Sequence, residues 1–210
     1  MMKTSMYRTL SLLAVASAAC AQSADSAMAD SPRPMGAAQA AAYQGPKETA
    51  IVAGGCFWGM ENVLRKAPGV ISVEVGYAGG KATTVSYEQV SAGDTGHAEA
   101  VRITFDPTKI SYEDLLVHWY FRGHDPTTLD RQNNDIGTQY RSEIFTTSEA
   151  QATEAAEALA RVAKSGKWGK PIVTKIEPAT TFVVAEDAHQ DYLIKHPGGY
   201  NDHFLRSFDF

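Results

Sequence analysis

A short apolar strand that runs directly into a helix constrains this chain more than any other feature of its sequence. Residues 49–53 are apolar, and across 57–66 the apolar residues recur at helical spacing until a Pro-Gly pair ends the pattern. The Gly-Gly-Cys sequence between them predicts that Cys56 sits where the strand ends and the helix begins. Unpaired backbone N–H groups and the positive end of the helix dipole meet at such a position, so we expect the thiolate of Cys56 to be favoured over the thiol.

The rest of the chain mixes strands and helices. Further strands are expected at 70–77, 98–105, 142–145, 172–176 and 181–185, and further helices at 111–121, 148–164 and 187–194. Some of the connections resemble hairpins, which favours an α+β fold over a doubly wound parallel sheet.

The first 46 residues differ in character from the remainder. A positively charged start, an apolar stretch and the small-x-small sequence Ala-Cys-Ala predict a signal peptide at residues 1–21. Residues 22–46, rich in Ala, Ser and Pro, predict a flexible linker, and 47–210 predict a single domain. We therefore expect export to the periplasm or another extracytoplasmic compartment. The alternative is a lipid anchor at Cys20, which would be the one reason to expect contact with a membrane.

Cysteine usage makes Cys56 informative. The chain has two cysteines, and removal of residues 1–21 leaves Cys56 alone. An exported protein is free to use disulfides, so an unpaired thiol needs an explanation. Cys56 is either a small buried apolar side chain or a reactive nucleophile, and its place at a helix start favours the nucleophile.

Glu99 is a candidate partner for this thiol. Residues 98–105 alternate strictly, which puts Glu99 on the same face as Val101, Ile103 and Phe105. A carboxyl group held against an apolar face has its pKa raised by desolvation, as a general acid near neutral pH requires. The alternative is that Glu99 lies at the strand end in contact with water.

Several classes of function lack support. The net charge of −5 and pI near 5.7 give no reason to expect binding to nucleic acid. The histidines have no ligand-like spacing, so we expect no metal site, and the Gly-Tyr-Ala-Gly-Gly sequence at 76–80 does not match a nucleotide-binding fingerprint. The polar loop at 131–142 is either a binding loop or a solvated connection.

Five sequence blocks resemble the A-type peptide methionine sulfoxide reductases, in order and across nearly all of residues 48–200. They are GGCFWGMEN, GYAGG, YEQVSAGDTGHAEAVRITFDP, HDPTTLDRQNNDIGTQYRS and AEDAHQDYL. The resemblance implies an α/β sandwich of ferredoxin-like character, with a mixed sheet and packed helices. It also implies that 47–210 is the catalytic domain, and that the substrates are oxidised proteins and peptides that carry methionine-S-sulfoxide.

The resemblance assigns roles to individual residues. Cys56 matches the family's nucleophile, Phe57 and Trp58 match the pocket for the substrate methyl group, and Glu99 matches the acid. Tyr87 and Tyr140 match its oxygen-binding tyrosines, and Asp135 matches the aspartate of the Asp-x-Gly-Thr-Gln-Tyr block.

These residue types suit sulfoxide reduction. The sulfoxide sulfur becomes electrophilic when its oxygen is protonated as a thiolate attacks, so the site needs a nucleophile, an acid and hydroxyl groups that hold the oxygen. By resemblance, Cys56 is left as a sulfenic acid that a thiol reduces, and no metal or organic cofactor takes part.

The tail departs from the family pattern in one respect. Many members carry a resolving cysteine after a Gly-Tyr pair, where this chain has Gly199-Tyr200-Asn201. We therefore expect an external donor, such as thioredoxin or a glutathione-like thiol, to act on oxidised Cys56, and we expect a monomer.

Two other functions are weighed against this one. The first is a cysteine hydrolase or acyltransferase with Cys56 as nucleophile, His97 as base and Asp135 as its orienting group. The second is an exported binding module in which Cys56 is structural and reacts slowly with alkylating agents.

Overall fold

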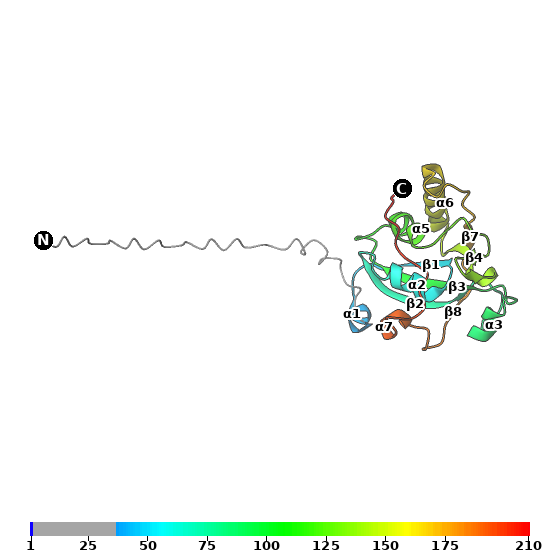
Figure 1. Ribbon diagram of the computed structural model, residues 1–210. Coiled ribbons are helices and arrows are strands. Elements are labelled where there is room, and N and C mark those ends of the chain that lie inside the picture. The colour runs from blue at the N-terminus through cyan, green and yellow to red at the C-terminus, as the bar shows by residue number, and fades with distance from the viewer. Residues whose placement is uncertain (2–36) are drawn as a thin grey trace. The chain divides into compact units, whose positions relative to one another are not determined.

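The structure, a computed structural model, describes Met1 and residues 37–210, and its centre is a six-stranded mixed sheet (Figure 1). The strand order is β7-β6-β1-β3-β2-β8, and only β6 and β7 pair in parallel. The strands are β1 (Glu48–Gly54), β2 (Val70–Ala78), β3 (Ala98–Phe105), β6 (Ser142–Thr146), β7 (Lys175–Pro178) and β8 (Phe182–Val184). The short strands β4 (Arg131–Gln132) and β5 (Asp135–Ile136) form a separate hairpin.

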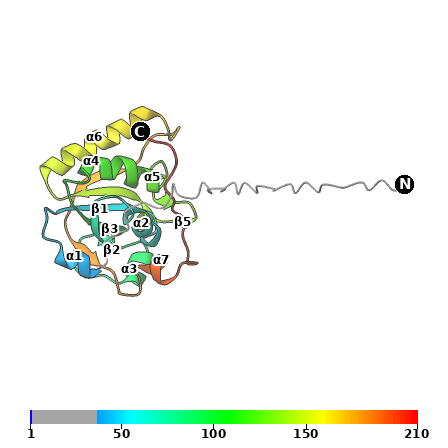
Figure 2. The same cartoon turned by 90° about the vertical axis from the view of Figure 1, so that its left-hand side faces the viewer.

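Helices surround this sheet, and three of them, α4, η1 and α5, run on from one another with a π-helical turn in the middle (Figure 2). In chain order they are α1 (Ala37–Ala42), α2 (Phe57–Leu64), α3 (Tyr87–Ser91), α4 (Tyr112–Leu115), η1 (Leu116–Tyr120), α5 (Phe121–Gly123), η2 (Thr138–Tyr140), α6 (Glu149–Ser165) and α7 (Tyr192–Lys195). None of the helices that the structure describes is long and apolar enough to cross a membrane.

The order of the four central strands explains the ferredoxin-like character of the fold. Along the chain the elements run β1, α2, β2, β3, then α4 to α5, then β6, and in space the strands lie β6-β1-β3-β2. This is the split βαβ arrangement, in which β3 inserts between the parallel strands β1 and β2. The expected α+β class and ferredoxin-like sheet are therefore confirmed.

The sheet is curled, because its two edges are joined by a very short connection. β7 is one edge and β8 the other, yet only residues 179–181 separate them in the chain. Ala179 and Phe182 close over a small cluster on the sheet face that carries Ala98 and Ala100. The opposite face carries Val101, Ile103 and Phe105 into the main core. This core is covered by α2, by α6 and by the continuous run of α4, η1 and α5.

Several local expectations need correction. The strand expected at 172–176 lies at Lys175–Pro178, and the helix expected at 187–194 is reduced to Tyr192–Lys195. The helix is shortened because the side chain of Gln190 pairs with the backbone of Val75 and holds 186–190 against β2. α3 was not expected from apolar spacing, but its capping box between Ser86 and Gln89 was readable in the sequence.

The expected signal peptide at 1–21 and most of the expected linker at 22–46 lie outside the described residues. Within the described part of that linker, residues 37–42 form α1 and the hydroxyl of Tyr43 donates a hydrogen bond to the carboxylate of Asp106.

Two buried tyrosines provide a matched test of this packing. The hydroxyl of Tyr120 is fully buried and donates to the carbonyl of Ala53, 2.8 Å away, at the end of β1. The hydroxyl of Tyr112 is also buried and has no hydrogen-bond partner among the described residues. We expect Tyr120→Phe to lower the free energy of unfolding by about 1–3 kcal/mol, and Tyr112→Phe to leave it unchanged or raise it. Urea unfolding of both variants measures this, and equal losses would contradict it.

Candidate active site

Cys56 lies at the junction predicted for it. β1 ends at Gly54, Gly55 turns the chain with a positive φ of 99°, and Cys56 is the residue that caps the N-terminus of α2. The side chain is nearly enclosed, since the residue is only 7% exposed. Gly55 is required here because a side chain at that φ would be strained and its Cβ would meet Gln132.

Glu99 lies beside Cys56 and is buried, as its position in β3 predicts. The residue is 2% exposed, and its carboxyl oxygen accepts a hydrogen bond of 3.0 Å from the backbone N–H of Phe57. Burial raises the pKa of Glu99 to about 8, although the Phe57 amide opposes the shift and the charges of Asp135 and Asp202 add to it. The carboxyl group is therefore largely protonated at neutral pH.

The resting state of Cys56 differs from the expectation. Burial, followed by the nearby Glu99 carboxyl, raises the pKa of Cys56 well above its ordinary value, and the backbone amide of Trp58 opposes this only in part. The expectation that the helix N-terminus favours a resting thiolate is therefore wrong. Enclosure of the sulfur outweighs the helix dipole, so Cys56 rests as a thiol that must lose its proton during the reaction.

Tyr87, Tyr140 and Asp135 come from three separate segments. Tyr87 opens α3, Tyr140 ends η2 and Asp135 begins β5. Burial raises the pKa of both tyrosines, and the charge of Glu99 raises them further because it lies near both rings. The hydroxyls of these tyrosines thus belong to the surroundings of Cys56, and both are protonated donors.

Phe57 and Trp58 form an apolar wall next to the sulfur. Phe57 is 1% exposed and packs against Tyr77 and His189. The Trp58 ring stacks on Tyr192 with 3.7 Å between ring centroids, and its N–H donates to Nδ1 of His189 at 3.2 Å. Because Nδ1 of His189 accepts this hydrogen bond, the ring is neutral, in keeping with a pKa lowered by burial.

The 186–192 segment holds this wall and Tyr87 in place. The carboxylate of Glu186 accepts from the hydroxyl of Tyr77 and from the backbone N–H of Tyr87, each at 2.9 Å. Sequence reasoning found the segment only as a family block and assigned no role to Glu186 or His189. The signal that could have identified them is the clustering of Glu, His, Gln and Tyr within seven residues.

The C-terminal tail contributes residues that sequence reasoning missed. The hydroxyl of Tyr200 donates to the carboxylate of Asp135 at 3.2 Å. The side chain of Asp202 is only 7% exposed, and its charge acts on Cys56, Glu99 and Asp135. Burial and Asp202 together raise the pKa of Asp135. The tail has no regular periodicity to indicate that it returns to the site, and the one pointer was the position at Gly199-Tyr200-Asn201 where many family members carry a resolving cysteine.

The alternative hydrolase arrangement is not formed. Nε2 of His97 contacts the carbonyl of Ala82 at 3.1 Å, and its ring lies against Gly80. The carboxylate of Asp135 is bonded to Tyr200 rather than to His97. Among residues 37–210, no group of three His, Cys, Asp or Glu side chains is arranged to hold a metal.

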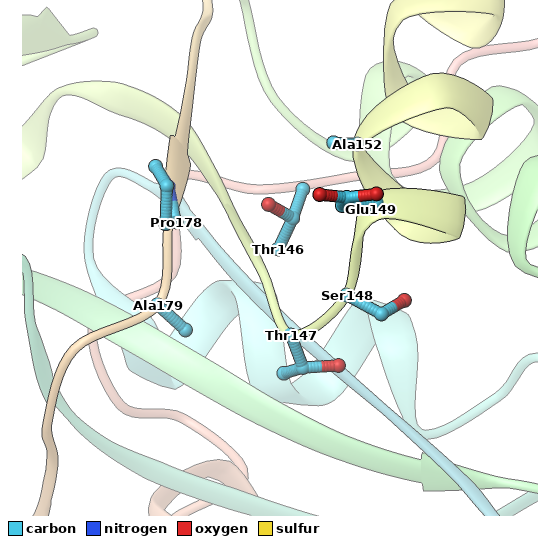
Figure 3. A pocket seen from close by; sticks show the side chains of 7 residues that line it. All are labelled: Thr146, Thr147, Ser148, Glu149, Ala152, Pro178 and Ala179. Atoms are coloured by element: carbon cyan, nitrogen blue, oxygen red, sulfur yellow. The ribbon is translucent and has the colours of Figure 1, made fainter.

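Two surface cavities formed by described residues lie away from Cys56. One of about 290 Å³ is formed where β6 meets α6 and β7, by Thr146, Thr147, Ser148, Glu149, Ala152, Pro178 and Ala179 (Figure 3). The other, of about 390 Å³, is lined by charged side chains of both signs that include Arg141 and Glu143, which pair with each other. Neither contains Cys56 or Glu99.

Comparisons with known proteins show which family the chain belongs to. The family model "Peptide methionine sulfoxide reductase" matches residues 48–208. The peptide methionine sulfoxide reductase MsrA of Deinococcus radiodurans is 52% identical over 152 residues, which cover 72% of this chain and 73% of the relative.

Solved structures show the same fold. Reduced Mxr1 from Saccharomyces cerevisiae matches with a TM-score of 0.71 and 40% identity over 77% of this chain and 93% of its own. Mxr1 in complex with Trx2 matches with a TM-score of 0.52 and 27% identity over 79% of this chain and 96% of its own. The chain belongs to the peptide methionine sulfoxide reductase family.

Proposed function

We propose that this protein reduces methionine-S-sulfoxide, in oxidised proteins and peptides and also as the free amino acid, to methionine with Cys56 as nucleophile, and so repairs oxidative damage. The observation that carries the proposal is the burial of a protonated Glu99 beside the lone thiol at the start of α2. A nucleophile and a proton donor in one enclosed site are what sulfoxide reduction needs. Membership of the family and the likeness to MsrA enzymes support the same reaction.

The reaction balances with the groups present. Glu99 gives its proton to the sulfoxide oxygen, Tyr87 and Tyr140 donate hydrogen bonds to that oxygen, and the sulfur of Cys56 attacks the sulfoxide sulfur. The thiol proton passes to the Glu99 carboxylate, the S–O bond breaks, and the oxygen ends on Cys56 as a sulfenic acid while methionine leaves. The substrate sulfur gains the two electrons that Cys56 loses.

The other site residues orient the substrate. Phe57 and Trp58 offer an apolar surface for the substrate methyl group, and the stacking of Trp58 on Tyr192 keeps this surface rigid. Asp135 accepts from Tyr200 and supports the polar side of the site. No organic cofactor or metal enters this scheme.

An external thiol completes the cycle. Cys56 is the one cysteine among residues 37–210, so attack by a donor thiol on the sulfenic acid must release water and form a mixed disulfide, which a second thiol then resolves. A thioredoxin-type dithiol fits, because it carries both thiols, and the complex of Mxr1 with Trx2 supports such a partner.

Export of a monomer is part of the same proposal. Residues 1–21 have the pattern of a signal peptide, and the linker-like composition of 22–46 separates it from the domain. The alternative to cleavage after residue 21 is a lipid anchor at Cys20. An intact-mass measurement of the processed chain distinguishes the cleaved form from the lipidated one.

Substitution of Cys56 and Glu99 tests the chemistry. With S-methionine sulfoxide and excess dithiothreitol, Cys56→Ser should abolish turnover. Glu99→Gln should fold normally and lose about 10² to 10⁴ in kcat, the usual contribution of a positioned acid. R-methionine sulfoxide, assayed separately, should not be reduced. Turnover by Cys56→Ser, or equal use of both epimers, would contradict the proposal.

The pH profile tests the protonation state of Glu99. Because burial raises its pKa to about 8, the acid is available below that pH and is lost above it. We expect kcat/KM of the wild type to be flat from about pH 6 to 7 and to fall as pH rises through about 8. Glu99→Gln should lack this fall. An identical alkaline limb in wild type and variant would assign the titration to another group.

The oxidised product tests the recycling step. Without reductant, the mature protein should release one equivalent of methionine, and Cys56 should then react with a sulfenic-acid trap such as dimedone. Mass spectrometry should find no intramolecular disulfide. A disulfide to retained Cys20 would show that recycling takes place within the chain.

A further inference from the structure

The last 15 residues form a C-terminal tail, 196–210, that crosses the site and is fixed beyond it. After α7 the tail runs to its end beside α5 and α6 (Figures 1 and 2). The backbone N–H of Arg206 donates to the carbonyl of Arg122 at 3.1 Å, and the Arg122 guanidinium returns hydrogen bonds to the Arg206 carbonyl. The segment over the site is therefore held on both sides.

His203 is the most enclosed side chain of this tail. Its side chain is 0% exposed, its Nε2 lies 2.7 Å from the carbonyl oxygen of Gly54, and its Nδ1 lies 2.6 Å from Oδ1 of Asp202. A carbonyl only accepts hydrogen bonds, so Nε2 carries a proton. Nδ1 lies against a carboxylate oxygen, which can only accept hydrogen bonds when it is ionised, so a proton on Nδ1 would make this contact attractive.

Asp202 is suited to hold a positive charge on this ring. Burial acts to raise the pKa of Asp202, but the contact with His203, together with hydrogen bonds from Asn133 and from the backbone of Asp202 itself, lowers the pKa overall. The side-chain amide of Asn133 donates to the Asp202 carbonyl at 2.9 Å and fixes the backbone of the residue. The contact between Asp202 and His203 is bent rather than a straight hydrogen bond, so it acts mainly as an ion pair.

The turn that carries Cys56 is built around the His203 ring. A Cβ on Gly59, in the first turn of α2, would lie 2.4 Å from Nδ1 of His203, and one on Gly55 would lie 3.0 Å from its Cε1. The ring thus fills the space that a side chain at Gly59 would occupy, and it also bonds the carbonyl of Gly54. This close approach explains glycine at 59, and at Gly55 it adds to the positive φ and the contact with Gln132.

We propose that His203, held as an imidazolium by Asp202, is a positioning residue for Cys56. Its hydrogen bond to the Gly54 carbonyl fixes the turn that presents the sulfur at the N-terminus of α2. This inference rests on the proposed function, because the geometry it fixes is that of the attacking thiol. Sulfur placement matters because a displacement of about 1 Å can cost about 100-fold in rate.

A second His–Asp pair, between His118 of η1 and Asp209 of the same tail, supplies the control. Nδ1 of His118 lies 2.6 Å from Oδ1 of Asp209, the same distance as in the buried pair, but the two side chains are 29% and 61% exposed. His118 and Asp209 have no contact with the Cys56 turn, and an exposed pair contributes little. The control variants are therefore His118→Ala and Asp209→Asn. They make the same chemical changes as His203→Ala and Asp202→Asn, and they likewise remove a contact that holds the tail.

The rate measurement is single-turnover formation of methionine by the full chain, without reductant. His203→Ala and Asp202→Asn should lose about 10- to 100-fold in the rate at saturating sulfoxide with little change in half-saturation, and the control variants less than about twofold. Added imidazole should restore part of the His203→Ala rate, and His203→Gln should retain more, because its amide N–H can reach Gly54. A folded His203→Ala with wild-type rate would overturn the proposal.

A second measurement does not depend on activity, and its main readout uses the wild-type protein. In wild-type protein labelled with ¹⁵N-histidine, both ring nitrogens of His203 should be protonated at pH 7, and Asp202→Asn should remove one of these protons. A neutral His203 in the wild type would overturn the proposal. Inactivity of the wild type towards both sulfoxide epimers, with a doubly protonated His203, would instead contradict the proposed function.

Discussion

The hydrogen bond from the backbone N–H of Phe57 to the carboxyl of Glu99 is the contact on which the site depends. It joins the first turn of α2 to β3 and so fixes the sulfur and the acid relative to each other. The backbone amide is the only hydrogen-bond donor to Glu99 given by the described residues, and Arg or Lys side chains do not contribute to its shift. A buried carboxyl without a cation stays protonated, and a protonated acid is the form the chemistry uses.

Burial raises the pKa of both Cys56 and Glu99, and this decides the order of the proton transfers. A thiol and a carboxylic acid side by side hold two protons before substrate arrives. Transfer of the Glu99 proton to the sulfoxide oxygen leaves a carboxylate beside Cys56, and that carboxylate can accept the thiol proton. In the proposed reaction, Glu99 would thus serve as acid and base in one step, and the substrate itself would trigger the activation of Cys56.

The parts predictable from sequence are those in which one local pattern decides the structure. Strict alternation located β3 at 98–105 and put Glu99 on the buried face, and two glycines after an apolar strand located Cys56. What sequence could not show depends on contacts between distant segments. The shortening of α7 follows from the hydrogen bonds between Gln190 and Val75, which are 115 residues apart. The raised pKa of Cys56 follows from burial and from the charges of distant residues that include Asp202.

The tail, residues 196–210, carries no cysteine, so the proposed catalytic cycle needs a partner to reduce Cys56 again. A tail that carried a second thiol would have to move to reach the sulfenic acid and then move away again. Here the corresponding segment presents Asp202 and His203, the side chain of His203 is buried against the Cys56 turn, and Arg122 and Asn133 hold the segment on either side. Such a tail holds the turn of the nucleophile Cys56 rigidly, but it cannot reduce oxidised Cys56 within the chain. Both thiols that reduce the proposed sulfenic acid must therefore come from outside residues 37–210.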